Sequence, residues 1–246
     1  MQHRSKKIKK SFFIILVVLI VLSGGSAIYL GNYYHSVDVE KYMNGSSEVS
    51  VKKFDKGWFF DGAGEEKALI FYPGAKVATE AYAPLMYQLA ESGIDCFLVD
   101  MPFHMAFFGM NRAEEIMQEY NYEAWYLGGH SLGGAMAANF AADYVEDHTD
   151  GIRGLLLLAA YPTKDLSTSD MSVVTVYGSE DGVLNMDKIV AGRELMPQDY
   201  KEVCIEGGNH AQFGSYGAQK GDGTAAIPAE EQWARTVEVF VGDESE

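Results

Sequence analysis

Segments with a strand pattern alternate with helical segments along most of the chain. Strand patterns cover residues 68–72, 94–99, 125–127, 155–160, 173–177 and 200–205. Helical spacing of apolar side chains follows between and after them, over residues 79–92, 112–120, 132–147, 187–195 and 228–241. Several strands are uninterrupted apolar runs, which is typical of strands buried on both faces. The pattern therefore predicts an α/β fold, with a mostly parallel central sheet covered by helices on both faces.

The first thirty residues have a different pattern. Residues 1–10 hold five basic side chains, and residues 12–22 are eleven apolar residues in a row. One interpretation is a membrane anchor over residues 12–30, which is long enough to cross a bilayer. The other is a signal peptide that is cleaved beside Gly25 or Ala27.

Both interpretations place the following domain outside the cytoplasm, because basic flanks stay on the cytoplasmic side of a membrane. We expect an N-terminal targeting segment and connector, residues 1–35, and a single domain, residues 36–246. The uncleaved chain would be a single-pass protein of the cell membrane, and cleavage would make it a secreted protein.

The composition agrees with one globular domain, since 246 residues that are 48% hydrophobic can bury a full core. With 19 Lys and Arg against 35 Asp and Glu, the net charge is −16. A nucleic-acid-binding protein needs a basic surface, so we expect no nucleic-acid partner. The only cysteines, Cys96 and Cys204, lie in strand patterns and lack the spacing of a metal site. We expect both to be unpaired thiols in the core.

A G-x-S-x-G motif stands between the strand at residues 125–127 and the helix at residues 132–147, with Ser131 at its centre. In this context the motif predicts a sharp, strained turn that exposes a nucleophilic hydroxyl at the carboxyl end of the sheet. Glycines stand two residues to either side, where side chains would collide with neighbouring backbone. Ser131 is therefore the candidate nucleophile.

A serine hydroxyl needs a base to remove its proton, and a carboxylate must orient that base. His210 follows the last strand and Asp181 follows the strand before it, so both reach the same edge of the sheet. We predict His210 as the general base and Asp181 as its partner. His104 also follows a strand, which makes it a candidate to line the pocket. The ring of His130, inside the motif, should point away from the reaction.

Backbone N–H groups must stabilise the oxyanion of the tetrahedral intermediate. We predict that Leu132, the residue after the nucleophile, supplies one of them. The second should come from the turn after residues 68–72, where Ala75 is the first choice and Lys76 the alternative.

Taken together, these motifs resemble those of the alpha/beta-hydrolase superfamily over roughly residues 48–242. More narrowly, the chain is similar to a small group of bacterial membrane-anchored members. The shared motifs read YPGAKV at residues 72–77, GHSLGG at 129–134, YGSEDG at 177–182 and GGNHAQFG at the start of 207–223. Ala75 departs from this pattern, because a second glycine is expected there.

The resemblance implies the alpha/beta-hydrolase fold and a Ser-His-Asp triad that needs no metal or organic cofactor. Many relatives carry a cap domain between the strands that correspond to residues 155–160 and 173–177. Here only residues 161–172 separate those strands, so we expect no sizeable cap and an open site.

The loop at residues 211–227 is long and rich in glycine, and loops of this length are often functional. Candidates in this loop to contact a substrate or to hold His210 are Gln212, Tyr216, Gln219 and Asp222. The alternative is that the loop is only a structural rim of the site. Together with Lys76 and His104, Gln212 is a possible substrate-lining residue.

The leading hypothesis is a serine hydrolase that cleaves an ester or related acyl bond of a small-molecule substrate through an acyl-enzyme. An acyltransferase or a peptidase would use the same triad, and the motifs do not separate them. A non-catalytic surface interaction module is a further alternative, against which the complete triad argues.

Overall fold

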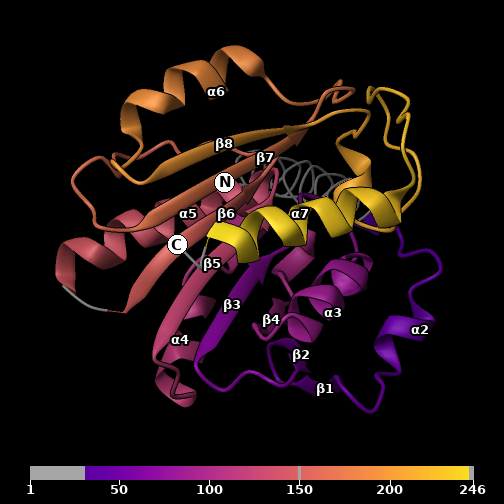
Figure 1. Ribbon diagram of the computed structural model, residues 1–246, viewed down its shortest axis with the longest axis horizontal. Helices are drawn as coiled ribbons and strands as arrows, with labels where there is room; N and C mark the ends of the chain where they lie inside the picture. The colour runs from indigo at the N-terminus through magenta and orange to yellow at the C-terminus, as the bar shows by residue number, and fades with distance from the viewer. Residues whose placement is uncertain (1–30, 149–150, 244–246) are drawn as a thin grey trace, which may run out of the picture. The chain divides into compact units, whose positions relative to one another are not determined.

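The structure is a computed structural model that describes residues 31–148 and 151–243 (Figure 1). The expected membrane segment at residues 12–30 lies outside these residues. Among the described helices, none is long and apolar enough to cross a membrane. The described residues from Tyr34 onward form one compact unit.

An eight-stranded sheet runs through this unit, with the strand order β1-β2-β4-β3-β5-β6-β7-β8 in the described residues. β1 (Ser50–Phe54) and β2 (Gly57–Asp61) form an antiparallel hairpin, and β2 pairs antiparallel with β4. The remaining strands pair in parallel: β3 (Lys67–Tyr72), β4 (Asp95–Val99), β5 (Ala124–His130), β6 (Ile152–Leu158), β7 (Ser172–Gly178) and β8 (Tyr200–Ile205). The prediction of a mostly parallel α/β sheet is confirmed.

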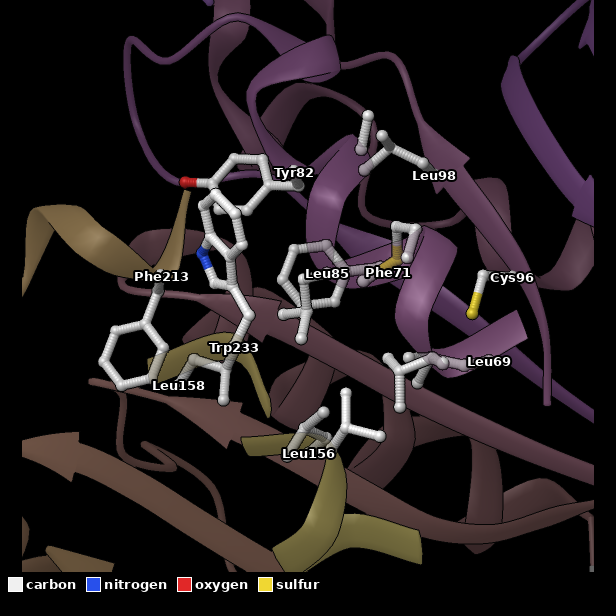
Figure 2. Packing of buried hydrophobic residues seen from close by; sticks show 14 of the residues in the cluster. Leu69, Phe71, Tyr82, Leu85, Cys96, Leu98, Leu156, Leu158, Phe213 and Trp233 are labelled. Carbon is white, nitrogen blue, oxygen red and sulfur yellow. The ribbon is translucent and has the colours of Figure 1, made fainter. Parts of the chain in front are cut away.

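Helices cover both faces of the sheet. On one face, α3 (Ala83–Glu91) and α7 (Ala229–Asp243) lie side by side (Figure 1). Their buried side chains, such as Leu85 and Trp233, pack against Leu69 and Phe71 of β3 (Figure 2). On the other face, α4 (Arg112–Glu119) and α5 (Leu132–Asp147) pack against Ile70 and the other alternate residues of β3. Because β3 is buried on both faces after Lys67, its sequence is continuously apolar from Ala68 to Tyr72.

Two expected helices begin or end differently in the structure. A 3₁₀ turn, Thr79–Tyr82, precedes α3, and Pro84 occupies the first turn of the helix, where its missing N–H costs nothing. α6 (Met186–Gly192) is shorter than expected, because a separate 3₁₀ turn, Arg193–Leu195, follows it. A further short helix, α2 (Glu40–Met43), precedes β1.

Both cysteines are free thiols, as expected, but only Cys96 lies in the core. The prediction that Cys204 is a core residue is wrong. Cys204 is exposed because its strand, β8, is at the edge of the sheet. Burial raises the pKa of the Cys96 thiol well above its ordinary value, which keeps this thiol protonated.

The parallel strands β3 to β8 end at one edge of the sheet, so the turns that follow them meet there. Residues 159–171, which connect β6 to β7, contain no helix or strand. This connection therefore forms no large cap over the edge, as expected.

Candidate active site

Ser131 occupies a strained turn between β5 and α5. Its backbone angles are φ 54° and ψ −121°, a conformation that costs energy for any residue with a side chain. The N–H of Ser131 donates to the carbonyl oxygen of Leu158, at the end of β6, at 2.9 Å. The strand–turn–helix geometry that the G-x-S-x-G motif predicts is therefore present.

The glycines of this turn are required by close backbone contacts. A Cβ on Gly133 would lie 2.0 Å from the carbonyl oxygen of Tyr72, at the end of β3. A Cβ on Gly129 would lie 2.5 Å from the carbonyl carbon of Gly133. Because real Cβ atoms do not approach so closely, glycine alone lets the turn pack directly against the end of β3.

His210 and Asp181 form a buried pair at the ends of β8 and β7. Nδ1 of His210 lies 2.8 Å from Oδ2 of Asp181, and both side chains are only 2% exposed. The other oxygen, Oδ1, accepts the backbone N–H groups of Val183 at 2.8 Å and Leu184 at 2.7 Å. Since an ionised carboxylate only accepts, Nδ1 of His210 carries the proton, and Nε2 is free to act as a base.

Asp222 joins the loop after β8, which carries His210 and which we call the histidine loop, to the turn that carries Asp181. Its Oδ1 accepts N–H groups from Gly182 at 3.1 Å, His210 at 3.3 Å and Gly223 at 2.9 Å. Its Oδ2 accepts the N–H of Ala211 at 2.8 Å. Of the two roles considered for this residue, its contacts are those of a residue that holds His210 in place.

Ser131 and His210 line one cavity of about 230 Å³. The other residues that line the cavity come from the start of α5 (Leu132 and Ala135), the turn after β6 (Ala159, Ala160 and Tyr161) and the turn after β7 (Val183, Leu184 and Asn185). Within the described residues, the hydroxyl of Ser131 and the imidazole of His210 share this cavity but form no direct hydrogen bond with each other. Catalytic hydrogen bonds of this kind often form only when a substrate is bound.

The candidates Lys76, His104 and Gln212 are not among the residues that line this cavity. The side-chain amide of Gln212 donates to the carbonyl oxygen of Ile227, and its own backbone carbonyl accepts from the indole of Trp233. Gln212 therefore ties the histidine loop to Ile227 and to Trp233 of α7.

The turn after β3 leaves one of its two candidate oxyanion donors unused. The N–H of Lys76 already donates to the carbonyl oxygen of His104 at 2.8 Å, which removes it as a donor to substrate. The N–H groups of Ala75 and Leu132 have no acceptor within the described part of the chain. Of the two candidates in this turn, the contacts thus favour Ala75 over Lys76.

A buried hydroxyl connects this turn to the serine turn. The hydroxyl of Tyr82 accepts the N–H of Gly74 at 3.0 Å and lies 2.7 Å from Nδ1 of His130. The ring of His130 is outside the cavity and lies 4.4 Å, centroid to centroid, from the ring of His210. Burial lowers the pKa of His130 well below its ordinary value, so this ring stays neutral behind His210.

Sequence patterns do not reveal the role of Tyr82. Its apolar neighbours and helical spacing make it resemble a core residue, and Figure 2 shows its ring among apolar side chains. Within residues 31–148 and 151–243, no group of three or more His, Cys, Asp or Glu side chains is placed to hold a metal ion.

Comparison with known proteins identifies the fold. A model described as the alpha/beta hydrolase family matches residues 68–234. No curated protein matches the sequence.

Several solved structures share the fold at low sequence identity. Carboxyl esterase 2 from the fungus Tuber melanosporum has a TM-score of 0.59 at 13% identity, covering 85% of this chain and 89% of that chain. A thermostable esterase from Pseudomonas putida ECU1011 has a TM-score of 0.56 at 17% identity, covering 90% and 88%. A monoacylglycerol lipase from Paleococcus ferrophilus has a TM-score of 0.57 at 14% identity, covering 80% and 99%. These likenesses concern the fold alone.

Proposed function

This chain belongs to the alpha/beta hydrolase family, and on that premise we propose that it is a serine hydrolase that cleaves carboxylic esters. One observation carries the proposal. The buried His210–Asp181 pair, at 2.8 Å, opens into the same cavity as Ser131, whose backbone is held in a strained turn. Strain at such a turn is typical of functional sites.

The first half of the reaction acylates the serine. Nε2 of His210 removes the proton from Oγ of Ser131 as the oxygen attacks the ester carbonyl. Asp181 keeps Nδ1 of His210 protonated and stabilises the imidazolium that forms. The N–H groups of Leu132 and Ala75 stabilise the oxyanion of the tetrahedral intermediate. His210 then gives its proton to the departing alcohol.

The second half releases the acid. A water molecule loses a proton to Nε2 of His210 and attacks the carbonyl carbon of the acyl-enzyme. Collapse of the second tetrahedral intermediate returns the proton to Oγ of Ser131. The neutral ring of His130 assists indirectly, because it places no second positive charge beside the His210 imidazolium.

The shape of the site favours a short acyl group. The cavity beside Ser131 is about 230 Å³, and no large cap extends it. Esterases are among the proteins that share the fold, which supports an ester as the bond that is cleaved.

The enzyme acts outside the cytoplasm in this proposal. The basic residues 1–10 and the apolar residues 12–30 anchor the chain in the cell membrane, with the domain on the outer side. Protease added to cells without a wall should digest the domain. Recovery of the full-length chain from the cytosol would contradict this location.

Turnover of p-nitrophenyl acetate by the full chain in detergent tests the chemistry. Ser131→Ala and His210→Ala should each lower kcat by about 10⁴–10⁶-fold, and the double variant should be no slower than either single variant. A fluorophosphonate probe should label the parent chain and fail to label Ser131→Ala. Asp170→Ala is a matched control, because Asp170 is an exposed carboxylate outside the site.

Each outcome has a definite meaning. Absence of both turnover and labelling in the parent chain would refute the proposal. If His210→Ala kept more than about a tenth of the activity, a barrier change below about 1.4 kcal/mol, another residue would be the base.

A further inference from the structure

Three phenylalanines form an exposed group in the loop after β4, at the edge of the sheet that carries the candidate active site. Phe103, Phe107 and Phe108 are 58%, 48% and 54% exposed. Their rings touch one another, with centroids 5.5 Å apart for Phe103 and Phe108 and 4.1 Å apart for Phe107 and Phe108. We call these three residues the aromatic cluster. A contiguous exposed apolar group of this kind indicates an interaction surface, whereas scattered apolar residues do not.

The loop that carries the aromatic cluster has no formal charge. Residues 101–111 contain no Asp, Glu, Lys or Arg, in a chain whose net charge is −16. The one titratable side chain, His104, has its pKa lowered by burial, which keeps it neutral near pH 7. An acidic surface is repelled by anionic lipid, so this uncharged loop is a face of the domain that can approach a membrane.

The backbone holds the aromatic cluster in its exposed position. Phe103 and His104 have φ angles of 57° and 55°, a left-handed conformation that is unfavourable for residues with side chains. The carbonyl oxygen of His104 accepts the N–H of Lys76, and the carbonyl oxygen of Asp100 accepts from the guanidinium of Arg112. The exposed rings therefore belong to a loop that is fixed at both of its sides.

The described chain enters the domain at the same place. The N–H of Tyr34 donates to the carbonyl oxygen of Lys76 at 2.7 Å, and its own carbonyl accepts the N–H of Ala78 at 2.8 Å. Residues 31–33 alone separate Tyr34 from the end of the apolar segment at residues 12–30. Three extended residues span at most about 11 Å. A membrane that holds the apolar segment is thus within a short reach of the turn that contacts the loop carrying the aromatic cluster.

We infer that the aromatic cluster rests in the surface of the membrane that anchors the chain, so that the active site receives esters presented at that surface. Aromatic rings are favoured at the boundary between lipid headgroups and acyl chains, where an uncharged loop loses little hydration. The inference rests on the proposed hydrolase function for its substrate and on the proposed anchor for its geometry.

Lipid quenching tests the contact without any turnover. The full chain, reconstituted in phosphatidylglycerol–phosphatidylethanolamine vesicles, carries Phe107→Trp, and lipids brominated near the top of the acyl chain are the quencher. Fluorescence of the new Trp should fall well below that of the same variant in unbrominated vesicles. Glu91→Trp is the control, because Glu91 is exposed at the end of α3, at the opposite edge of the sheet. Equal quenching of the two variants would overturn the inference.

Kinetics test the consequence for substrate. Replacing all three phenylalanines by Ser should lower kcat/KM for a short-acyl ester carried on a lipid in the same vesicles by about tenfold or more. Turnover of soluble p-nitrophenyl acetate should stay unchanged. An equal loss on both substrates, or conversion of a dimer to a monomer by the triple substitution, would overturn the inference. If the parent chain hydrolyses neither substrate, the proposed function fails, while the quenching result still decides the membrane contact.

Discussion

The substitution Asp222→Ala tests whether the hydrogen bonds of Asp222 position the candidate active site, without changing the side chains proposed to react. Asp222 touches neither Ser131 nor the cavity, yet its carboxylate accepts four backbone N–H groups, from Gly182, His210, Ala211 and Gly223. These donors lie in the two loops that bring Asp181 and His210 together. Removing the carboxylate leaves both proposed catalytic side chains in the protein but takes away the contacts that join their two loops.

The size of the effect follows from these four contacts. A hydrogen bond to a charged group contributes about 1.5–3 kcal/mol, but Asp222 is only half-buried and water can replace part of the loss. We expect the free energy of unfolding to fall by about 2–4 kcal/mol, near the upper end for one substitution. Tm should fall by roughly 5–15 °C in a domain of this size. Displacement of the imidazole by less than 1 Å should lower kcat by about tenfold to 100-fold.

Two variants make the result specific to Asp222. Asp222→Asn keeps one oxygen for the N–H groups of Gly182, His210 and Gly223, and it should recover most of kcat. Asp170→Ala removes an exposed carboxylate of the same charge and should change neither Tm nor kcat. Thermal unfolding and p-nitrophenyl acetate kinetics measure both effects. If Asp222→Ala kept the Tm and kcat of the parent chain, the four contacts would not position the histidine loop, and the reasoning would be refuted.

Three further predictions concern the neighbours of the site. Tyr82→Phe leaves the N–H of Gly74 and Nδ1 of His130 without their buried partner, so thermal unfolding should show a loss of about 1–3 kcal/mol, with a lower kcat for esters. Across p-nitrophenyl esters, kcat/KM should be highest for short acyl groups, because the cavity is about 230 Å³, and a steady rise to the C12 ester would contradict this. Because burial lowers the pKa of His130, below about pH 6.5 this residue is protonated in the unfolded chain but stays neutral in the folded chain. The free energy of unfolding should therefore fall by up to about 1.4 kcal/mol for each pH unit below that value. Urea unfolding at pH 5–7.5 should show that the free energy of unfolding falls less steeply with decreasing pH in His130→Gln than in the parent chain. The fall that is left in this variant is due in part to His104, whose pKa is also lowered.

Sequence periodicity was sufficient to predict the parallel core of this fold. Residues 200–205 were predicted as a strand with the bounds that β8 has, and β3, β4 and α4 lie within one or two residues of their predicted ends. Periodicity did not reveal that the segment at residues 79–92 begins as a 3₁₀ turn, because that depends on local backbone geometry around Pro84. It also misplaced Cys204, since the pattern of a strand does not say whether the strand is central or at an edge.

The candidate site was predictable to the extent that its residues lie in local motifs. Ser131 is found from the glycines around it, and Asp181 and His210 from their places after consecutive strands. Asp222 could only be named as one of several polar residues in a long loop, because its partners lie up to 40 residues away in sequence. Tyr82 gave no signal at all, since a tyrosine on an apolar helical face has the same pattern whether or not its hydroxyl is used.

Backbone strain offers a second route to the same edge of the sheet. In the described residues, most non-glycine residues with positive φ follow the ends of four neighbouring strands: Lys76 after β3, Phe103 and His104 after β4, Ser131 after β5 and Ala159 after β6. Backbone hydrogen bonds to a neighbouring turn or strand hold three of them: Lys76 donates to His104, Ser131 to Leu158 at the end of β6, and Ala159 to Val176 within β7. Strained residues persist only where their surroundings fix them, and these bonds fix the backbone at the three turns. In the proposed mechanism, Ala75 and Leu132 directly adjoin two of these strained residues, Lys76 and Ser131, and backbone N–H groups that are fixed before a substrate arrives can stabilise an oxyanion without reorganisation.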